Sequence, residues 1–570
     1  MTDPAQSVQG LQVSRLRQIA VPKASKPAGG GAWTLAALAL AALAGLPIAA
    51  ILWAALAGDS AGSGRTLADL AATVLPTYIA NTALLMLLAG GIAAVIGTGC
   101  AWLIAATRFP GRRILGWALV LPLALPAYLA AYIYADMLDF AGPVQTGLRS
   151  AMGWGPADYA FPDIRSLGGG AFVLGSVLYP YVYLLARTAF ATQSLTQFRA
   201  ARSLGAAPAR AFWSVALPAA RPAIAGGLAL VLMEVLADFG VAEYFAIPTF
   251  STGIFRSWLA MGDKQAALKL AAVMLVFVIA LVAWEAQSRR GRSDSRDGLA
   301  VRPEDEPLVA LSALGKGLAF AACCVPVLLG FVLPAGYLAS LALTDTAQAA
   351  AGEIGTYIRG SLWLGIATAA LCLVAALLLA FARARSASRV TASAIRLATL
   401  GYALPGALLA VGFLAPLGSF DQSLTRFARD SFGWSGGLLL TGTSAILVYA
   451  LSVRFLTVAY NSVSGGLARI PPGLDAAARS LGAGPARVLA RIYAPLLAPS
   501  LAGAAALVFI DTLRELPATL ILRPFNLETL ATRTYRLASD ERLVEASIPA
   551  LILLAAGLLP VLVLNRLGKR

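Results

Sequence analysis

Histidine is absent from this sequence and charge is scarce: 13% of the residues are charged, whereas 59% are hydrophobic. Without an imidazole, the chain lacks the commonest general base, the usual transition-metal ligand and any Ser-His or Cys-His nucleophile pair. So few charged residues cannot cover the surface of a soluble protein of 570 residues, and the mean hydropathy is +0.76. The sequence therefore predicts an integral membrane protein that is not an enzyme.

Cysteine is also rare, and the balance of charge has one sign. The four cysteines lie inside apolar runs, where they act as small hydrophobic residues and not as a disulfide framework. There are 44 Lys and Arg against 28 Asp and Glu, a formal net charge of +16. In a membrane protein this excess is typical of cationic cytoplasmic loops, so we expect lipid and not nucleic acid as a partner.

Apolar runs of about twenty residues are long enough to cross the bilayer, and a helix satisfies its own backbone there. Twelve such runs predict twelve transmembrane helices in an all-α fold. The first is too long for the core of a signal peptide and is expected to stay as an anchor. The predicted spans are 33–57, 79–106, 114–137, 169–190, 222–246, 268–287, 317–342, 360–382, 393–415, 437–459, 499–522 and 546–566.

Arginines gather on one side of the predicted membrane. Clusters follow the second, fourth, sixth and eighth spans, for example at Arg108, Arg199, Arg289 and Arg383. By the positive-inside rule this side is the cytoplasm, and it also holds both termini. The loops on the opposite side, which include 138–167 and 416–435, are expected to face outward.

One polar segment occurs twice, as AARSLGAAPAR at 200–210 and AARSLGAGPAR at 477–487. The copies are 277 residues apart, measured between Gly205 and Gly482, and an ungapped register continues beyond them. Six spans lie on either side of a charged linker, so the two copies share one orientation about a pseudo-twofold axis along the membrane normal. We expect a cytoplasmic segment 1–32, a first half 33–287, a cytoplasmic linker 288–308 and a second half 309–570.

Each repeated segment is too polar to be a span. The pattern predicts two short helices that bend at Gly205 and end at Pro218. A single such loop could merely cap the bilayer and fix the topology. A loop that occurs twice with the same glycine, prolines and arginines indicates a specific surface.

The segments resemble the EAA loops of binding-protein-dependent ABC importer permeases, at 199–218 and 476–495. The family's leading glutamate is replaced by Arg199 and Ala476. The resemblance implies the type I ABC importer fold, with each loop forming a coupling helix in a groove of a separate ATPase subunit, of which two copies are needed. The matching residues are Ala200, Ala201, Arg202, Gly205, Pro218, Ala477, Ala478, Arg479, Gly482 and Pro495.

The chain has no Gly-x-x-x-x-Gly-Lys-Ser/Thr phosphate loop. We therefore expect no cofactor on this chain, and ATP with Mg²⁺ on the partner subunits. The resemblance also implies a periplasmic binding protein as a partner, and a location in the inner membrane of a Gram-negative bacterium.

Four carboxylates recur in the fifth and eleventh spans. Glu234 aligns with Asp511 and Asp238 with Glu515, and the members of each half are four residues apart, on one face of a helix. Acids at membrane depth are costly, so they are functional candidates for a pathway that passes a cation. The alternative is that they pair with arginines such as Arg514 and lock helices together.

The outer segments contain Arg256 and Arg533 in the ungapped register. They can be plain surface helices, but in the family this face meets the lobes of the binding protein, which makes both arginines candidate docking residues. The segments DFGVAEYFAIPTFSTGIFRSW and ELPATLILRPFNLETLATRTY are most similar to ferric iron permeases, so iron is the expected cargo.

Two cargo classes and two other protein classes remain open. Thiamine and polyamine permeases are relatives of the ferric iron permeases, and their cargoes are also cations. A secondary transporter could use the same four acids as proton or sodium sites, although it has no reason to duplicate a cytoplasmic docking surface. A membrane enzyme is the least favoured class because no nucleophile constellation is present.

Overall fold

The computed structural model describes residues 30–56, 67–191, 195–290, 309–386, 388–433, 435–471 and 473–567. Nearly all of the predicted cytoplasmic segment 1–32 and of the linker 288–308 lies outside these residues. Within them the chain is helical, and its only β-type pairing is an isolated bridge between Thr107 and Val309. The predicted all-α class is confirmed.

Ten helices are long and apolar enough to cross a membrane, and a bent pair makes an eleventh candidate. The twelfth predicted span corresponds to a shorter apolar helix, Leu543–Leu559. The main helices are α2 (Gly30–Leu56), α4 (Leu75–Ala106), α8 (Leu167–Ala189), α11 (Leu217–Ala237), α14 (Lys264–Arg290), α15 (Ala313–Val327) with α16 (Leu333–Ala342), α18 (Ile354–Arg385), α20 (Gly406–Phe432), α21 (Ser444–Ala468), α24 (Ala494–Arg514) and α27 (Leu543–Leu567).

The predicted third span is not one straight helix. A bend of 92° separates Arg112–Ala124, which contains α5 (Arg112–Ala118), from Ala127–Met152, which contains α6 (Ala127–Leu138) and α7 (Pro143–Met152). Proline has no N–H and disfavours the helical conformation of the residue before it. Leu125 accordingly has ψ 119° before Pro126.

The second half breaks in the same way. Leu404 has ψ 125° before Pro405, which separates α19 (Arg389–Ala398) and a short 3₁₀ turn from α20. The helix α20 then runs past Pro416 to Phe432, where the sequence predicted an outer loop from residue 416. That loop prediction is wrong for most of its length. Buried Asp421 holds the returning chain by accepting hydrogen bonds from three successive backbone N–H groups, beginning at Leu439.

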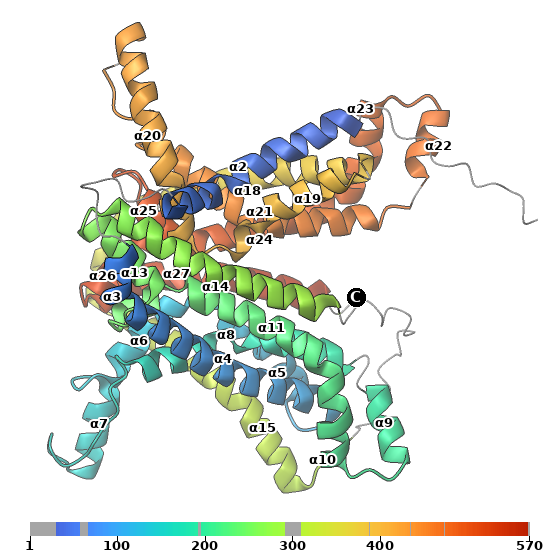
Figure 1. Ribbon diagram of the computed structural model, residues 1–570. Coiled ribbons are helices and arrows are strands. Elements are labelled where there is room, and N and C mark those ends of the chain that lie inside the picture. Colours follow the sequence, from blue (N-terminus) through green and yellow to red (C-terminus); the bar gives the residue numbers. More distant parts are fainter. Residues whose placement is uncertain are drawn as a thin grey trace, which may run out of the picture.

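The two halves exchange their first helices. The helix α2 packs against α18, α19 and α20 of the second half, whereas α15 packs against α4 and α5 of the first (Figure 1). Glycines permit both approaches: a Cβ at Gly412 would lie 2.9 Å from the carbonyl oxygen of Pro47, and one at Gly330 would lie 2.5 Å from that of Ser176. The described parts of the two halves therefore form one interlocked body.

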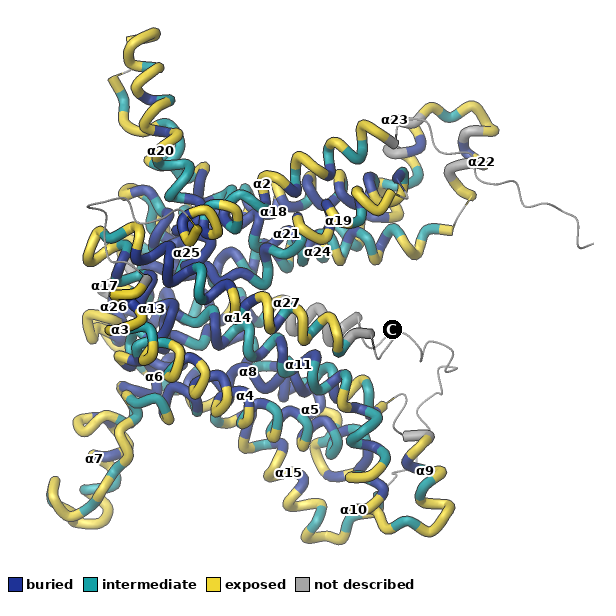
Figure 2. Tube along the Cα trace, viewed as in Figure 1, coloured by how far each residue is buried: buried dark blue, intermediate teal, exposed yellow. Residues whose placement is uncertain are grey.

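The elements divide between two ends of the molecule. Figure 1 shows α9 (Leu195–Ser203), α10 (Pro208–Ala211), α22 (Leu474–Ser480) and α23 (Pro485–Val488) at one end, and α7, α13 (Phe250–Phe255) and α26 (Leu530–Ser539) at the other. Figure 2 shows buried residues concentrated where the halves meet and exposed residues along the outer helix faces. Large apolar side chains such as Trp53 and Leu87 are exposed there, as expected of a lipid-facing surface.

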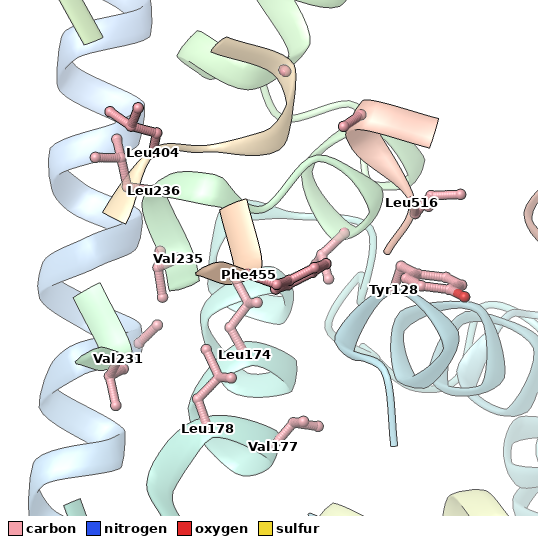
Figure 3. Close-up of a cluster of buried hydrophobic side chains, with 14 of the residues drawn as sticks. Tyr128, Leu174, Val177, Leu178, Val231, Val235, Leu236, Leu404, Phe455 and Leu516 are labelled. Carbon is pink, nitrogen blue, oxygen red and sulfur yellow. The ribbon is translucent and has the colours of Figure 1, made fainter. Parts of the chain in front are cut away.

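Buried side chains of both halves meet in the middle. Figure 3 shows Leu174 and Leu178 of α8 and Val235 of α11 in one cluster with Phe455 of α21 and Leu516. The two halves thus share an apolar core, and it surrounds the cavity described next.

Candidate functional site

The first repeated segment is two short helices joined by a glycine. The helix α9 ends at Ser203, Gly205 follows with φ +87°, and α10 begins at Pro208. Such a positive φ is the left-handed region that glycine adopts without cost. The predicted bend at Gly205 is therefore present.

The predicted stop at Pro218 is wrong. A π-helical turn at Phe212–Ala216 leads directly into α11, and the N–H of Leu217 bonds the carbonyl of Phe212, five residues back. The wider turn accommodates a proline in the first turn of α11, where its missing N–H costs little. The loop is therefore connected without a break to α11, which carries Glu234 and ends at the residue before Asp238.

The second copy repeats this geometry. The helix α22 is followed by Gly482 with φ +77°, by α23 and by a π-helical turn at Leu489–Tyr493 before α24. Pro495 lies in the first turn of α24, as Pro218 does in α11. The side chain of Arg479 lies outside the described residues.

The two segments present an apolar tip. Leu204 is 88% exposed and Leu481 is 87% exposed, and each directly precedes the glycine of its loop. Sequence analysis did not single out these leucines, although both copies of the motif contain them. Arg202, one of the predicted coupling residues, donates from its guanidinium to the carbonyl of Ala206 at 2.6 Å and so stabilises the bend.

Aromatic packing anchors the first loop. Trp102 of α4 lies with its ring centroid 5.2 Å from that of Phe198 in α9 and 4.8 Å from that of Phe212. Buried Phe190 lies 5.2 Å from the same tryptophan. Aromatic contacts thus join α9 to α4, to the end of α8 and to the turn that precedes α11.

All four predicted pathway acids line one cavity of about 190 Å³ between the halves. Its walls come from both halves, because α8 and α11 face α21 and α24. The Leu-Pro breaks also border it, since Leu125 and Pro126 are among its lining residues. The cavity is also lined by four residues that the sequence did not mark as functional: Tyr128, Tyr181, Tyr402 and Arg454.

Two of the four acids are helix caps. Asp238 Oδ2 accepts hydrogen bonds from the N–H groups of Val241 and Ala242, each at 3.1 Å, at the start of α12 (Gly240–Tyr244). The backbone is extended at Asp238, with ψ 131°, so α11 ends before it. Asp238 is thus the residue that follows the end of α11, one turn after Glu234, and both side chains line the same cavity as predicted.

Glu515 has the same role in the second half. Its Oε1 accepts from the N–H of Ala518 at 2.9 Å, and its Oε2 accepts from the N–H and hydroxyl of Thr519 at 2.9 and 2.7 Å, at the start of α25 (Pro517–Leu522). It also forms an ion pair with Arg454 at 3.4 Å. Pairing of an acid with an arginine thus occurs, but the arginine is Arg454 and not Arg514.

Glu234 and Asp511 differ from these caps. In the described part of the chain neither carboxylate has a hydrogen-bond or ion-pair partner, although the charges of Arg454 and Arg514 act on both. The acids therefore fall into two classes, a pair used as caps and a pair whose oxygens remain available to a ligand in the cavity.

The described residues contain no group of three His, Cys, Asp or Glu side chains arranged to hold a metal ion. The two available carboxylates can attract a cation, but they do not form a closed coordination cage. Weak, incomplete coordination suits a site that passes a cation on and does not retain it.

The outer arginines are not structural counterparts. Both outer helices begin with a threonine capping box, Thr249 with Thr252 and Thr529 with Thr532, which are 280 residues apart and not 277. Because three additional residues precede the second box, the counterpart of Arg256 is Arg536. The predicted alignment of Arg256 with Arg533 is therefore wrong.

The predicted docking arginines are both partly exposed. Arg256 pairs with Glu243 at 3.3 Å, and the guanidinium of Arg533 lies over the ring of Tyr357 at 5.2 Å from its centroid. Arg536 forms an ion pair with Glu528. All three lie on or beside α13 and α26, at the end of the molecule opposite the repeated loops.

Comparison with known proteins relates this architecture to transport. Residues 93–287 match the family described as the binding-protein-dependent transport system inner membrane component. The chain is 26% identical over 530 residues to the Fe(3+)-transport system permease protein FbpB 2 of Haemophilus influenzae, covering 92% of this chain and 96% of that protein.

Two shorter relatives are named for different cargoes. A probable molybdenum ABC transporter permease of Haloferax volcanii is 27% identical over 42% of this chain and 86% of its own length. A putative 2-aminoethylphosphonate transport system permease of Salmonella typhimurium is 33% identical over 24% of this chain and 51% of its own length.

Proposed function

We propose that this chain is the permease of an ABC importer and passes ferric iron across the bacterial inner membrane. Its residues 93–287 match the inner membrane component family of binding-protein-dependent transport systems. The observation that carries the cargo is the similarity over nearly the full length of both chains to an Fe(3+)-transport permease. The cavity supports it, because Glu234 and Asp511 offer the oxygen ligands that hard cations prefer.

The repeated loops are the surfaces for two copies of an ATPase subunit. Both loops have the same bend, and Leu204 and Leu481 give each an exposed apolar tip of the kind that fills a groove on a partner. ATP and Mg²⁺ bind to those subunits, since this chain has no phosphate loop. The residues proposed to make the contact are the predicted ones together with the two leucines.

The arginine-rich side of the molecule faces the cytoplasm, with both termini. The end that carries α7, α13 and α26 then faces the periplasm, where a binding protein delivers the cargo. Arg256 and Arg533 remain proposed docking residues there, and Arg536 joins them as the structural counterpart of Arg256.

Transport follows from the position of the cavity between the interlocked halves. Closure of the two ATPase subunits on ATP moves the loops, and the continuous connection from α10 through the π turn to α11 transmits that movement to the cavity wall. The cavity then opens first to one side of the membrane and afterwards to the other. Glu234 and Asp511 attract the cation in both states without holding it in a closed cage.

Uptake of radiolabelled ferric iron tests this function in cells that express the permease with its binding protein and ATPase. We expect energy-dependent iron uptake that excess thiamine and spermidine do not reduce. The Glu234→Gln/Asp511→Asn double variant should reduce it at least tenfold, whereas the control Arg426→Gln, on the exposed face of α20, should not. Assembly with ATP hydrolysis but without iron uptake would refute the iron assignment and favour an organic cation as cargo.

A further inference from the structure

The charges of the cavity are asymmetric. The first half contributes Glu234 and Asp238 and no cation, whereas both arginines of the cavity, Arg454 on α21 and Arg514 on α24, belong to the second half. In the register that aligns Glu234 with Asp511, the counterpart of Arg514 is Ala237, which also lines the cavity. The duplicated fold therefore does not require a cation at Arg514.

Arg514 is not used to stabilise the protein as Arg454 is. Arg454 pairs with Glu515, but Arg514 makes no hydrogen bond or ion pair with a described residue, and its Nε is buried without an acceptor. Tyr128 lies in the same wall, is 6% exposed, and its hydroxyl also lacks a partner. Unpaired buried donors are costly, so these two groups indicate a ligand that accepts hydrogen bonds.

The net charge of the cavity points to the same ligand. With all groups ionised, four carboxylates and two guanidinium groups give a formal charge of −2. A ferric ion changes this to +1, and charge in a low-dielectric site is strongly disfavoured unless it is compensated. One monovalent anion would make the loaded cavity neutral.

Coordination adds a second reason. A hard cation takes about six oxygen ligands, and only Glu234 and Asp511 offer carboxylates that are not already bonded. An oxyanion supplies further hard oxygens to the metal, and its other oxygens remain free to accept hydrogen bonds. A guanidinium group is suited to this because its fixed fork of donors matches phosphate and carboxylate-like oxyanions.

We propose that ferric iron crosses this cavity together with a small oxyanion, with Glu234 and Asp511 facing the metal and Arg514 and Tyr128 donating to the anion. The inference rests on the proposed iron transport. The shared chemistry is that of a monovalent oxyanion, which dihydrogen phosphate and bicarbonate both provide.

The test is double-label uptake into proteoliposomes that contain the complete complex, with the binding protein supplied outside. ⁵⁵Fe is combined in separate arms with ³²P-phosphate or ¹⁴C-bicarbonate, and the ratio of anion to iron accumulated is measured. We expect about one anion per iron in one of the two arms, dependent on ATP. Iron uptake with neither anion would overturn the proposal, whereas absence of iron uptake from an ATP-hydrolysing complex would instead refute the iron assignment.

Variants of Arg514 locate the anion. Arg514→Gln should lower the amount of anion accumulated about tenfold and reduce iron uptake with it, because one charge-assisted donor is lost. Arg514→Lys keeps the charge and should retain part of both activities. The surface variant Arg426→Gln is the matched control and should behave as the wild type. Anion and iron uptake that both stay at the wild-type level in an Arg514→Gln complex that still assembles would contradict the assignment of Arg514.

Discussion

Substitutions in the two classes of cavity acid should have opposite effects on the free energy of unfolding. The larger effect is expected at Glu515. In Glu515→Ala, the start of α25 loses its cap, which costs about 1 kcal/mol. The substitution also leaves Arg454, whose side chain is 13% exposed, without its only ion-pair partner among the described residues. Breaking a buried ion pair by removal of one partner costs about 3–5 kcal/mol. We therefore expect Glu515→Ala to lower the free energy of unfolding by about 4–6 kcal/mol.

The comparison variant is Asp511→Ala, at a residue in the last turn of α24 that makes no bond to a described residue. Removal of an unpaired carboxylate from the cavity relieves a desolvation cost, so this variant should be as stable as the wild type or more stable. Thermal unfolding of the detergent-solubilised complex, with iron uptake measured on the same preparations, separates the two. Asp511→Ala should unfold at or above the wild-type midpoint and lose uptake.

Glu515→Gln provides an intermediate case. Both carboxylate oxygens accept backbone N–H groups, so the single amide oxygen of glutamine keeps only part of the cap, and the charge that pairs with Arg454 is lost as well. The destabilisation should still be smaller than in Glu515→Ala, which loses the whole cap. Equal unfolding midpoints for Glu515→Ala and Asp511→Ala would refute the division into caps and available carboxylates.

Three further predictions concern the loops, the outer arginines and the exchanged helices. Gly205→Val with Gly482→Val should weaken association with the ATPase at least tenfold, because a left-handed φ costs a β-branched residue about 1–2 kcal/mol at each position; unchanged co-purification of the ATPase would contradict this. Charge reversal of Arg256 and Arg533 together should lower binding-protein-stimulated ATP hydrolysis but not basal hydrolysis, and equal stimulation of variant and wild type would exclude docking at these residues. Gly412→Leu should destabilise the protein by at least about 2 kcal/mol because its side chain would meet the backbone of α2, and a wild-type unfolding midpoint would argue against the exchange of helices.

The all-α membrane class, the repeated segments and the bend within each of them could be predicted from the sequence. Each depends on the pattern of residues within a short stretch of chain. Apolar runs of bilayer length indicate helices regardless of their neighbours, and Gly205 and Gly482 are placed where the backbone needs a positive φ. The four acids also lie in one cavity, as the duplication of the segment that contains them led us to expect.

What the sequence could not predict depends on interactions between segments. Whether Asp238 faces a ligand or caps a helix is decided by the extended backbone at that residue, and nothing in a hydrophobic pattern shows this. The three additional residues before Thr529 fall in an irregular segment without a pattern of its own. An alignment of the two halves without gaps therefore could not reveal them. The exchange of α2 is a matter of packing between halves, which residue spacing does not record.

ATP-dependent accumulation of ⁵⁵Fe by proteoliposomes that contain the purified permease and its ATPase, with and without the binding protein outside, tests iron transport through this cavity. We expect uptake only when ATP and the binding protein are both present, and its loss in the Glu234→Gln/Asp511→Asn variant at an unchanged unfolding midpoint. Iron accumulation that proceeds equally well without both available carboxylates would contradict it.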